Sequence, residues 1–221
     1  MSGKKKVILT DAMDVLFCCF VDLPTLLHNV SGASEKQLGA RFWGMIDNLW
    51  GVCRADISEV ELWEKFVDGV DWVDDNGNSV DPEPEKLLMA FRENMKRRVS
   101  GTFEIYQKLQ EKYRVEFFMA SDHIAEIVPL LVEWHPDVFK MIPEERRFWS
   151  CDLRLVKRDP EFFPYVLKEM EEKFGVKKDE ILFIDDSEVN IEMARKNGIE
   201  AIRFVSAKQL AKDLKAYGFE I

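Results

Sequence analysis

The chemically reactive side chains of the sequence stand directly after short apolar runs, or in a loop between two of them. They are Asp11, Ser121, Asp122, Lys157, Asp185 and Asp186. Short apolar runs that end at polar residues are typical of buried parallel strands. A single aspartate after a strand is usually a turn or helix-capping residue. Because ligands bind at the carboxyl ends of parallel strands, polar residues after several strands favour one shared functional site.

The acidic members of this set predict a cation site. Asp11, Asp185 and Asp186 would bring three carboxylates together, and like charges at short range repel unless a cation or a shared proton intervenes. Carboxylate oxygens with room for water are typical ligands of Mg²⁺. Lys157 and the Ser121 hydroxyl would then donate to an anion that faces the metal.

Strand-like and helix-like segments alternate along most of the chain. A first strand is predicted at 7–10, and further strands at 115–120, 148–149, 181–184 and 201–204. Helices are predicted at 103–112, 124–134, 160–174 and 189–197, and after Ser206. Repeated strand–helix–strand units predict an α/β fold, with a Rossmann-like parallel sheet flanked by helices on both faces.

The segment from Phe20 to Arg98 has a helical period instead. Its signals are the apolar spacing of Leu38, Phe42, Ile46 and Leu49, the capping pair Ser58 and Glu61, and a helix start at Asp81-Pro82. Because this segment directly follows the first strand, we expect it to sit over that edge of the sheet. The expected domains are an all-helical cap at 20–98 and a core at 1–19 and 99–221.

The composition of the chain limits the kinds of partner that it is expected to bind. The chain has 31 basic and 41 acidic residues, a formal charge of −10, which disfavours nucleic-acid binding. No apolar stretch approaches the roughly 20 residues of a membrane span, so no membrane partner is expected. The cysteines at 18, 19, 53 and 151 form no C-x-x-C pair and are expected to be buried free thiols. Free thiols, together with the lack of a signal-peptide core at the N-terminus, predict a cytoplasmic location. The sequence indicates no oligomeric state.

Four segments, in order, resemble the motifs of the haloacid dehalogenase-like (HAD) hydrolase superfamily. Residues 7–17 resemble the first motif and 119–122 the second. Residues 156–163 resemble the third, with Arg158 where proline is usual, and 183–190 resemble the fourth. A helical insertion between the first and second motifs also resembles the cap of the superfamily's dehalogenase and phosphatase branch.

This resemblance implies a role for each residue of the set. Asp11 would be the nucleophile and form an aspartyl-phosphate. Ser121 and the backbone amide of Asp122 would hold phosphate oxygens. Lys157 would balance the charge of the nucleophile and of the phosphoryl group. Stabilising charge in this way supplies most of the catalysis in phosphoryl transfer.

The resemblance also implies which groups bind the Mg²⁺ ion. The second oxygen of Asp11 and the backbone carbonyl of Met13 would bind it, together with the acidic pair. Adjacent residues that leave a strand point to opposite faces, so Asp185 and Asp186 should not be equivalent. We expect Asp186 to bind the metal directly. Asp185 should act through a bridging water, or by contacting a direct ligand rather than the metal.

One departure from the family pattern concerns Met13. In the superfamily's phosphatases this position holds a second Asp that protonates the leaving oxygen and then activates water, and methionine can do neither. Asp14, where the family usually has glycine, is the nearest other carboxylate. A shift by one residue along an extended segment would turn it to the other face. The superfamily's dehalogenases also lack the second Asp, but their reaction uses no metal, and the acidic pair argues against them.

We therefore expect a Mg²⁺-dependent phosphatase that acts on a small phosphorylated metabolite. The alternatives are a catalytically inert HAD-fold binding protein and a metal-independent 2-haloacid dehalogenase-type hydrolase. Trp43, Trp50 and Trp63 lie at helical spacing in the expected cap, where core packing is favoured over lining a substrate pocket. For His123, after the second motif, packing or solvent exposure is likewise favoured over a place in the cavity.

Overall fold

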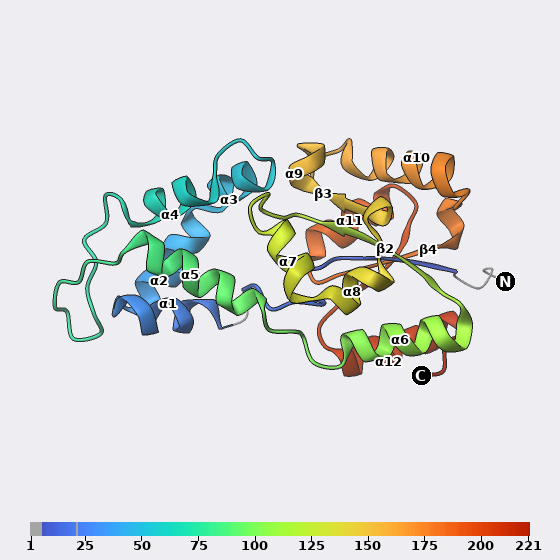
Figure 1. Cartoon of the computed structure of the whole chain (residues 1–221), viewed down its shortest axis with the longest axis horizontal. Coiled ribbons are helices and arrows are strands. Elements are labelled where there is room, and N and C mark those ends of the chain that lie inside the picture. The colour runs from blue at the N-terminus through green and yellow to red at the C-terminus, as the bar shows by residue number, and fades with distance from the viewer. Residues whose placement is uncertain (1–5, 21) are drawn as a thin grey trace.

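A parallel sheet forms the centre of the protein (Figure 1). The computed structural model describes residues 6–20 and 22–221. Within those residues the sheet has five strands in the order β3-β2-β1-β4-β5. They are β1 (Val7–Thr10), β2 (Glu116–Ser121), β3 (Arg147–Trp149), β4 (Ile181–Asp185) and β5 (Glu200–Arg203). All five predicted strands are confirmed to within a residue or two at each end.

Successive residues of β1 pack on opposite faces of the sheet. Val7 and Leu9 join a buried cluster with the helices α10 (Phe162–Phe174) and α11 (Glu188–Lys196). Ile8 joins a second cluster with α6 (Thr102–Tyr113) and α12 (Ala207–Leu214). The period of two in side-chain direction therefore buries both faces. The predicted α/β fold, with helices on both sides of a parallel sheet, is confirmed.

The chain between β2 and β4 differs in part from the expectation. The helix predicted from Ile124 begins only at Val128, as α7 (Val128–Trp134), with a proline in its first turn. Pro136 then starts α8 (Pro136–Met141), which was not predicted. Proline lacks an N–H and is favoured in the first turn of a helix, so each proline marks a start. The remaining short helices are α9 (Ser150–Leu153) and the 3₁₀ segments Glu144–Arg146, Lys178–Glu180 and Lys215–Tyr217.

A group of helices between β1 and α6 lies to one side of the sheet, on the left in Figure 1. They are α1 (Leu23–Ser31), α2 (Glu35–Gly44), α3 (Ile46–Cys53), α4 (Glu59–Val67) and α5 (Pro84–Met95). Their buried side chains are continuous with the cluster on the α6 and α12 face of the sheet. The domain boundaries at 19–20 and 98–99 stay a prediction.

Helix boundaries in this group are partly as expected. The Ser58 hydroxyl accepts a hydrogen bond from the Glu61 amide at 3.1 Å, which confirms Ser58 as the N-cap of α4. The predicted start at Asp81-Pro82 is wrong, because α5 begins at Pro84. The preceding Glu83 is extended, the conformation that a following proline favours.

The two connections between these helices and the sheet run side by side. The Cys18 amide donates to the Arg97 carbonyl and the Val99 amide donates to the Leu16 carbonyl, each at 2.9 Å. Phe17 and Arg98 form an antiparallel bridge between them. The helical group is therefore tied to the core directly beyond the carboxyl end of β1.

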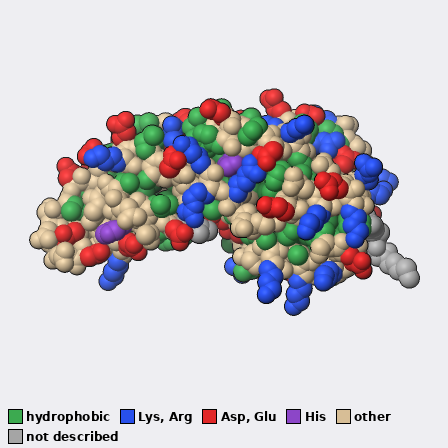
Figure 2. Space-filling model, turned by 60° about the horizontal axis from the view of Figure 1, so that its bottom comes forward, with side chains coloured by type: hydrophobic (Ala, Val, Ile, Leu, Met, Phe, Trp, Pro, Cys, Tyr) green, Lys and Arg blue, Asp and Glu red, His purple; other side chains and the backbone are tan. Residues whose placement is uncertain are grey.

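Two further observations concern the charged side chains on the surface and the lengths of the helices. Acidic and basic side chains are interspersed over the face shown in Figure 2. In the part of the chain that the structure describes, no helix combines the length and apolarity needed to cross a bilayer.

We expect Gly101→Ala to destabilise the protein by about 2 kcal/mol. Gly101 has φ +88°, and an added Cβ would lie 2.9 Å from the Cβ of Ala207 on α12. The matched control is Gly175→Ala, where φ is +67° but no heavy atom lies within 4 Å of an added Cβ. It should cost about 1 kcal/mol, the backbone cost alone. Urea unfolding of both variants would measure the difference, and equal losses would contradict a role for the Ala207 contact.

Candidate active site at the carboxyl edge of the sheet

Lys157 joins two carboxylates at the centre of the sheet edge. Its Nζ lies 2.8 Å from Oδ1 of Asp11 and 2.6 Å from Oδ2 of Asp185. All three side chains are almost completely buried. β1 and β4 are neighbours with Thr10 opposite Ile184, so Asp11 and Asp185 leave adjacent strands at the same height. The structure thus brings together three residues that are up to 174 positions apart in the sequence.

The carboxylates of Asp11 and Asp185 keep Lys157 positively charged. Burial alone would lower its pKa, but the carboxylates of Asp11 and Asp185 outweigh that effect and the pKa is raised. Lys157 therefore remains an ammonium ion at neutral pH. A buried charge is tolerated only when it is paired in this way.

The two members of the acidic pair have different surroundings. Besides Lys157, Asp185 accepts hydrogen bonds from the Ser187 amide at 2.9 Å and from Nδ2 of Asn190 at 3.1 Å. Asp186 is less buried and lines a cavity above the sheet edge. Burial, aided by the negative charge of Asp11, raises the pKa of Asp186 to about 6. Asp185 is thus held by the protein, whereas Asp186 faces the cavity.

A divalent cation fits the acidic residues at this edge. Asp11, Asp185 and Asp186 each offer an oxygen, and these oxygens lie within 4.8 Å of one another. Hard oxygen donors at this separation suit Mg²⁺. Besides burial, the negative charge of Asp11 raises the pKa of Asp186, because carboxylates this close repel without a cation between them.

The end of β2 contributes a hydroxyl and a further carboxylate. The Ser121 side chain is fully buried, and Oγ makes no hydrogen bond with any of the residues described. An unpaired buried hydroxyl is costly, so a ligand acceptor there would be favourable. Asp122 instead accepts from the backbone amide of Lys157 at 2.9 Å, which fixes the loop that carries Lys157. Burial raises the pKa of Asp122 to about 6.

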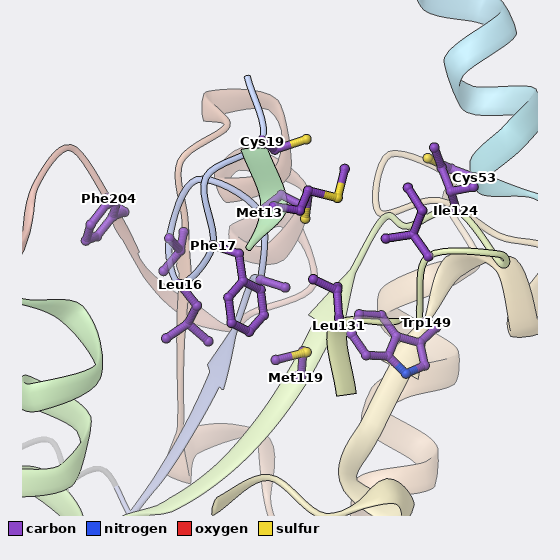
Figure 3. Close-up of a cluster of buried hydrophobic side chains, with 14 of the residues drawn as sticks. Met13, Leu16, Phe17, Cys19, Cys53, Met119, Ile124, Leu131, Trp149 and Phe204 are labelled. Atoms are coloured by element: carbon purple, nitrogen blue, oxygen red, sulfur yellow. The ribbon is translucent and has the colours of Figure 1, made fainter. Parts of the chain in front are cut away.

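The loop after β1 places Met13 in the cavity wall. Its side chain is 7% exposed and extends toward the side where Ile124 and Cys53 lie (Figure 3). Asp14 has φ +53°, the left-handed region that favours glycine. Its carboxylate accepts from the amides of Cys19 at 2.8 Å and Phe20 at 3.1 Å. Asp14 therefore holds the loop closed while it also lines the cavity.

A cavity of about 510 Å³ lies between this sheet edge and the helices α2, α3 and α5. Trp43 and Trp50 line it. The expectation of core packing was wrong for Trp43, which is 59% exposed, whereas Trp50 packs against the core and also lines the cavity. The expectation is confirmed for Trp63, which is 1% exposed in the core. Helical spacing could not separate them, because the apolar face of α2 and α3 extends past the core to the cavity.

Two cavity residues were not assigned a role from the sequence. The Arg158 guanidinium lies 3.8 Å from the centre of the Trp50 ring, and Asn190 holds Asp185 as described above. Their positions beside Lys157 and after Asp186 in the motifs were the available signal.

His123 is 2% exposed and lines the cavity, with its ring edge-on to Trp149. Burial lowers its pKa to about 4, so His123 is neutral at pH 7.

Comparison with known proteins identifies the fold. No protein-family model matches the sequence, and no curated protein sequence matches it. A predicted HAD-like family hydrolase from Porphyromonas gingivalis superposes with a TM-score of 0.68 at 15% identity, over 99% of this chain and 100% of that chain. A HAD family enzyme from Bacteroides thetaiotaomicron superposes with a TM-score of 0.65 at 16% identity, over 95% and 98%.

Two further structures with a similar fold contain bound ligands. The Bacteroides enzyme has also been solved in complex with magnesium and inorganic phosphate, with a TM-score of 0.61 at 17% identity over 91% of this chain and 95% of that chain. An L-2-haloacid dehalogenase from Xanthobacter autotrophicus, covalently bound to chloropropionic acid, has a TM-score of 0.61 at 15% identity over 96% and 83%. The protein therefore has the fold of the HAD-like hydrolases.

Proposed function

We propose that the protein is a Mg²⁺-dependent phosphatase of the HAD type, acting on a small phosphorylated metabolite through an aspartyl-phosphate. The observation that carries this proposal is the buried ion-pair network of Asp11, Lys157 and Asp185 beneath the cavity. It presents a carboxylate, an ammonium ion and the unpaired Ser121 hydroxyl at one point of the sheet edge. This set combines a nucleophile with donors for an anion.

Asp11 is the nucleophile in this proposal. An oxygen of its carboxylate attacks phosphorus, the bond from phosphorus to the leaving oxygen breaks, and the phosphoryl group is carried on Asp11. Water then attacks phosphorus, which releases inorganic phosphate and restores the carboxylate. Oδ1 accepts from the Ala12 amide at 2.7 Å as well as from Lys157, so the carboxylate is held in one orientation.

In this proposal the anion is held by three groups at the sheet edge. Lys157 supplies a fixed positive charge, and Ser121 and the Asp122 amide donate to phosphate oxygens. Donors that are in position before the reaction stabilise the developing charge without reorganisation. The Asp122 carboxylate supports this arrangement through its bond to the Lys157 amide.

Asp11, Asp186 and the Met13 carbonyl would hold Mg²⁺. Asp185 is a poorer direct ligand, because Lys157, Ser187 and Asn190 already occupy its oxygens. When bound, Mg²⁺ would neutralise phosphoryl charge and orient the phosphate.

We expect hydrolysis of an activated aryl phosphate such as p-nitrophenyl phosphate to fall at least about 100-fold when a chelator removes the metal. Excess Mg²⁺ should restore it. Release of p-nitrophenol before and after chelation measures this. Turnover that is unchanged by the chelator would contradict a metal-dependent phosphatase.

Two alternatives have specific support from Met13. A dehalogenase needs no second acid, Met13 extends toward the apolar side chain of Ile124, and a dehalogenase shares the fold. Halide release from a 2-haloacid in the presence of the chelator would favour it. An inert binding protein would be favoured if phosphate with Mg²⁺ raised the melting temperature while a broad panel of phosphate esters remained intact.

A further inference from the structure

The lining of the cavity is divided into a polar base and an apolar wall. The base comes from loops at the sheet edge and carries the charged groups, among them Asp11, Lys157 and Asp186. The opposite wall comes from residues 20–95. Its principal members are Phe20, Trp43, Ile46, Leu49, Trp50 and Phe91. Within the described chain, no lining residue from 20–95 has a charged, hydroxyl or amide side chain.

Arg158 marks the boundary between the two parts. It comes from the core, yet its guanidinium packs on the ring of Trp50 at 3.8 Å from the centroid. This contact fixes the Trp50 ring as a wall next to the polar base. Trp43, at the outer end of the same wall, is 59% exposed, so the apolar surface reaches from the base to solvent. An exposed aromatic surface that is continuous with a polar site indicates a ligand with the same two parts.

We propose that the substrate is a phosphate monoester of an apolar alcohol, whose hydrocarbon or aromatic group lies against the wall formed by α2, α3 and α5. This inference rests on the proposed function and specifies its substrate class. The phosphoryl group would reach Asp11 and Lys157, and the remainder of the ester would contact Trp43, Ile46 and Trp50. A cavity of about 510 Å³ has room for both parts.

A polyhydroxylated ester is disfavoured by the same wall. Each hydroxyl group that enters it loses water. Among the described lining residues of 20–95, only the indole N–H groups of Trp43 and Trp50 and the Cys53 thiol offer it a donor, and none offers a side-chain oxygen as acceptor. Discrimination by an apolar pocket against one added hydroxyl reaches about 100-fold. A sugar phosphate carries several hydroxyls, so we expect the preference for an apolar ester to reach at least that value.

The test compares 2-phenylethyl phosphate with glucose 6-phosphate. Both are monoesters of primary alcohols, so the leaving oxygen is of the same type and the difference lies in the attached group. We expect kcat/KM for 2-phenylethyl phosphate to exceed that for glucose 6-phosphate at least about 100-fold. Equal values, or a preference for the sugar phosphate, would overturn the inference and leave the phosphatase proposal intact.

A pair of variants locates the effect on the wall. Ile46→Gln places an amide in the cavity, and it should lower kcat/KM for 2-phenylethyl phosphate about 10-fold without lowering that for glucose 6-phosphate. Met89→Gln makes a comparable change on the exposed surface of α5, outside the cavity lining, and should alter neither value. Equal losses on both esters in Ile46→Gln would show that its effect is not specific to the apolar group.

Failure of the phosphatase proposal has a different signature. If no ester, p-nitrophenyl phosphate included, is hydrolysed, calorimetric titration of the wild-type protein with the same two esters and Mg²⁺ still decides the inference. Tighter binding of 2-phenylethyl phosphate would support the apolar wall as a ligand site. Equal or weaker binding would overturn it.

Discussion

Replacing Asp11 by asparagine is expected to lower kcat for p-nitrophenyl phosphate by about 10⁴ to 10⁶, the usual effect of removing a catalytic nucleophile. The amide has nearly the same shape as the carboxylate, but it carries no charge and is a far weaker nucleophile toward phosphorus. Lys157 would keep Asp185 as a partner at 2.6 Å, so its ammonium group stays paired and the site should remain folded. Release of p-nitrophenol from purified protein measures the loss.

Asp14→Asn is the matched control for Asp11→Asn. Both changes replace a carboxylate in the loop after β1, but Asp14 accepts hydrogen bonds from the amides of Cys19 and Phe20, and an amide oxygen can replace it there. We expect its activity to fall less than about 10-fold. Wild-type activity in Asp11→Asn would show that Asp11 is not the nucleophile. A large loss in folded Asp14→Asn would instead assign Asp14 a role in proton transfer.

The strands were predictable because each is a short apolar run. Every residue is buried in the strands Val7–Thr10 and Ile181–Asp185. The apolar composition of each run therefore indicates burial on both faces of the sheet. The order of strands was not predictable in the same way. It depends on which neighbours exchange hydrogen bonds, such as β1 between β2 and β4, and the sequence of one strand does not record its partners.

The site was predictable to the level of which residues meet. Asp11, Lys157 and Asp185 do converge, but the direct pairing of Lys157 with Asp185 was not expected. That pairing follows from the heights at which β1 and β4 end, which only the register fixes. The contact between Arg158 and Trp50 could not be predicted either, because it joins the loop that carries Lys157 to α3, and these two segments are far apart in the sequence. Helical spacing shows that Trp50 belongs to an apolar face but not what covers that face.

Met13→Asp is expected to raise activity toward alkyl phosphates by up to about 10² to 10⁴, the usual contribution of general acid–base catalysis. Met13 lies two residues after Asp11 and lines the same cavity, so a carboxyl group there would supply the proton that the leaving oxygen of an alkyl ester needs. Activity toward p-nitrophenyl phosphate should change far less, because that leaving group needs little protonation. The ratio of kcat/KM for 2-phenylethyl phosphate and p-nitrophenyl phosphate, in variant and wild type, measures the effect.

Met13→Asn separates proton transfer from a change of shape or polarity. It replaces the thioether by a group of the same size as aspartate that cannot act as an acid, so we expect no gain on alkyl phosphates. The Met13 carbonyl belongs to the backbone and is the same in both variants, which keeps the proposed Mg²⁺ ligands constant. If folded Met13→Asp shows no gain on any alkyl phosphate while the wild type hydrolyses them, another group already supplies the proton. Asp14 is then the first residue to test, because its carboxylate belongs to the same loop and lines the same cavity.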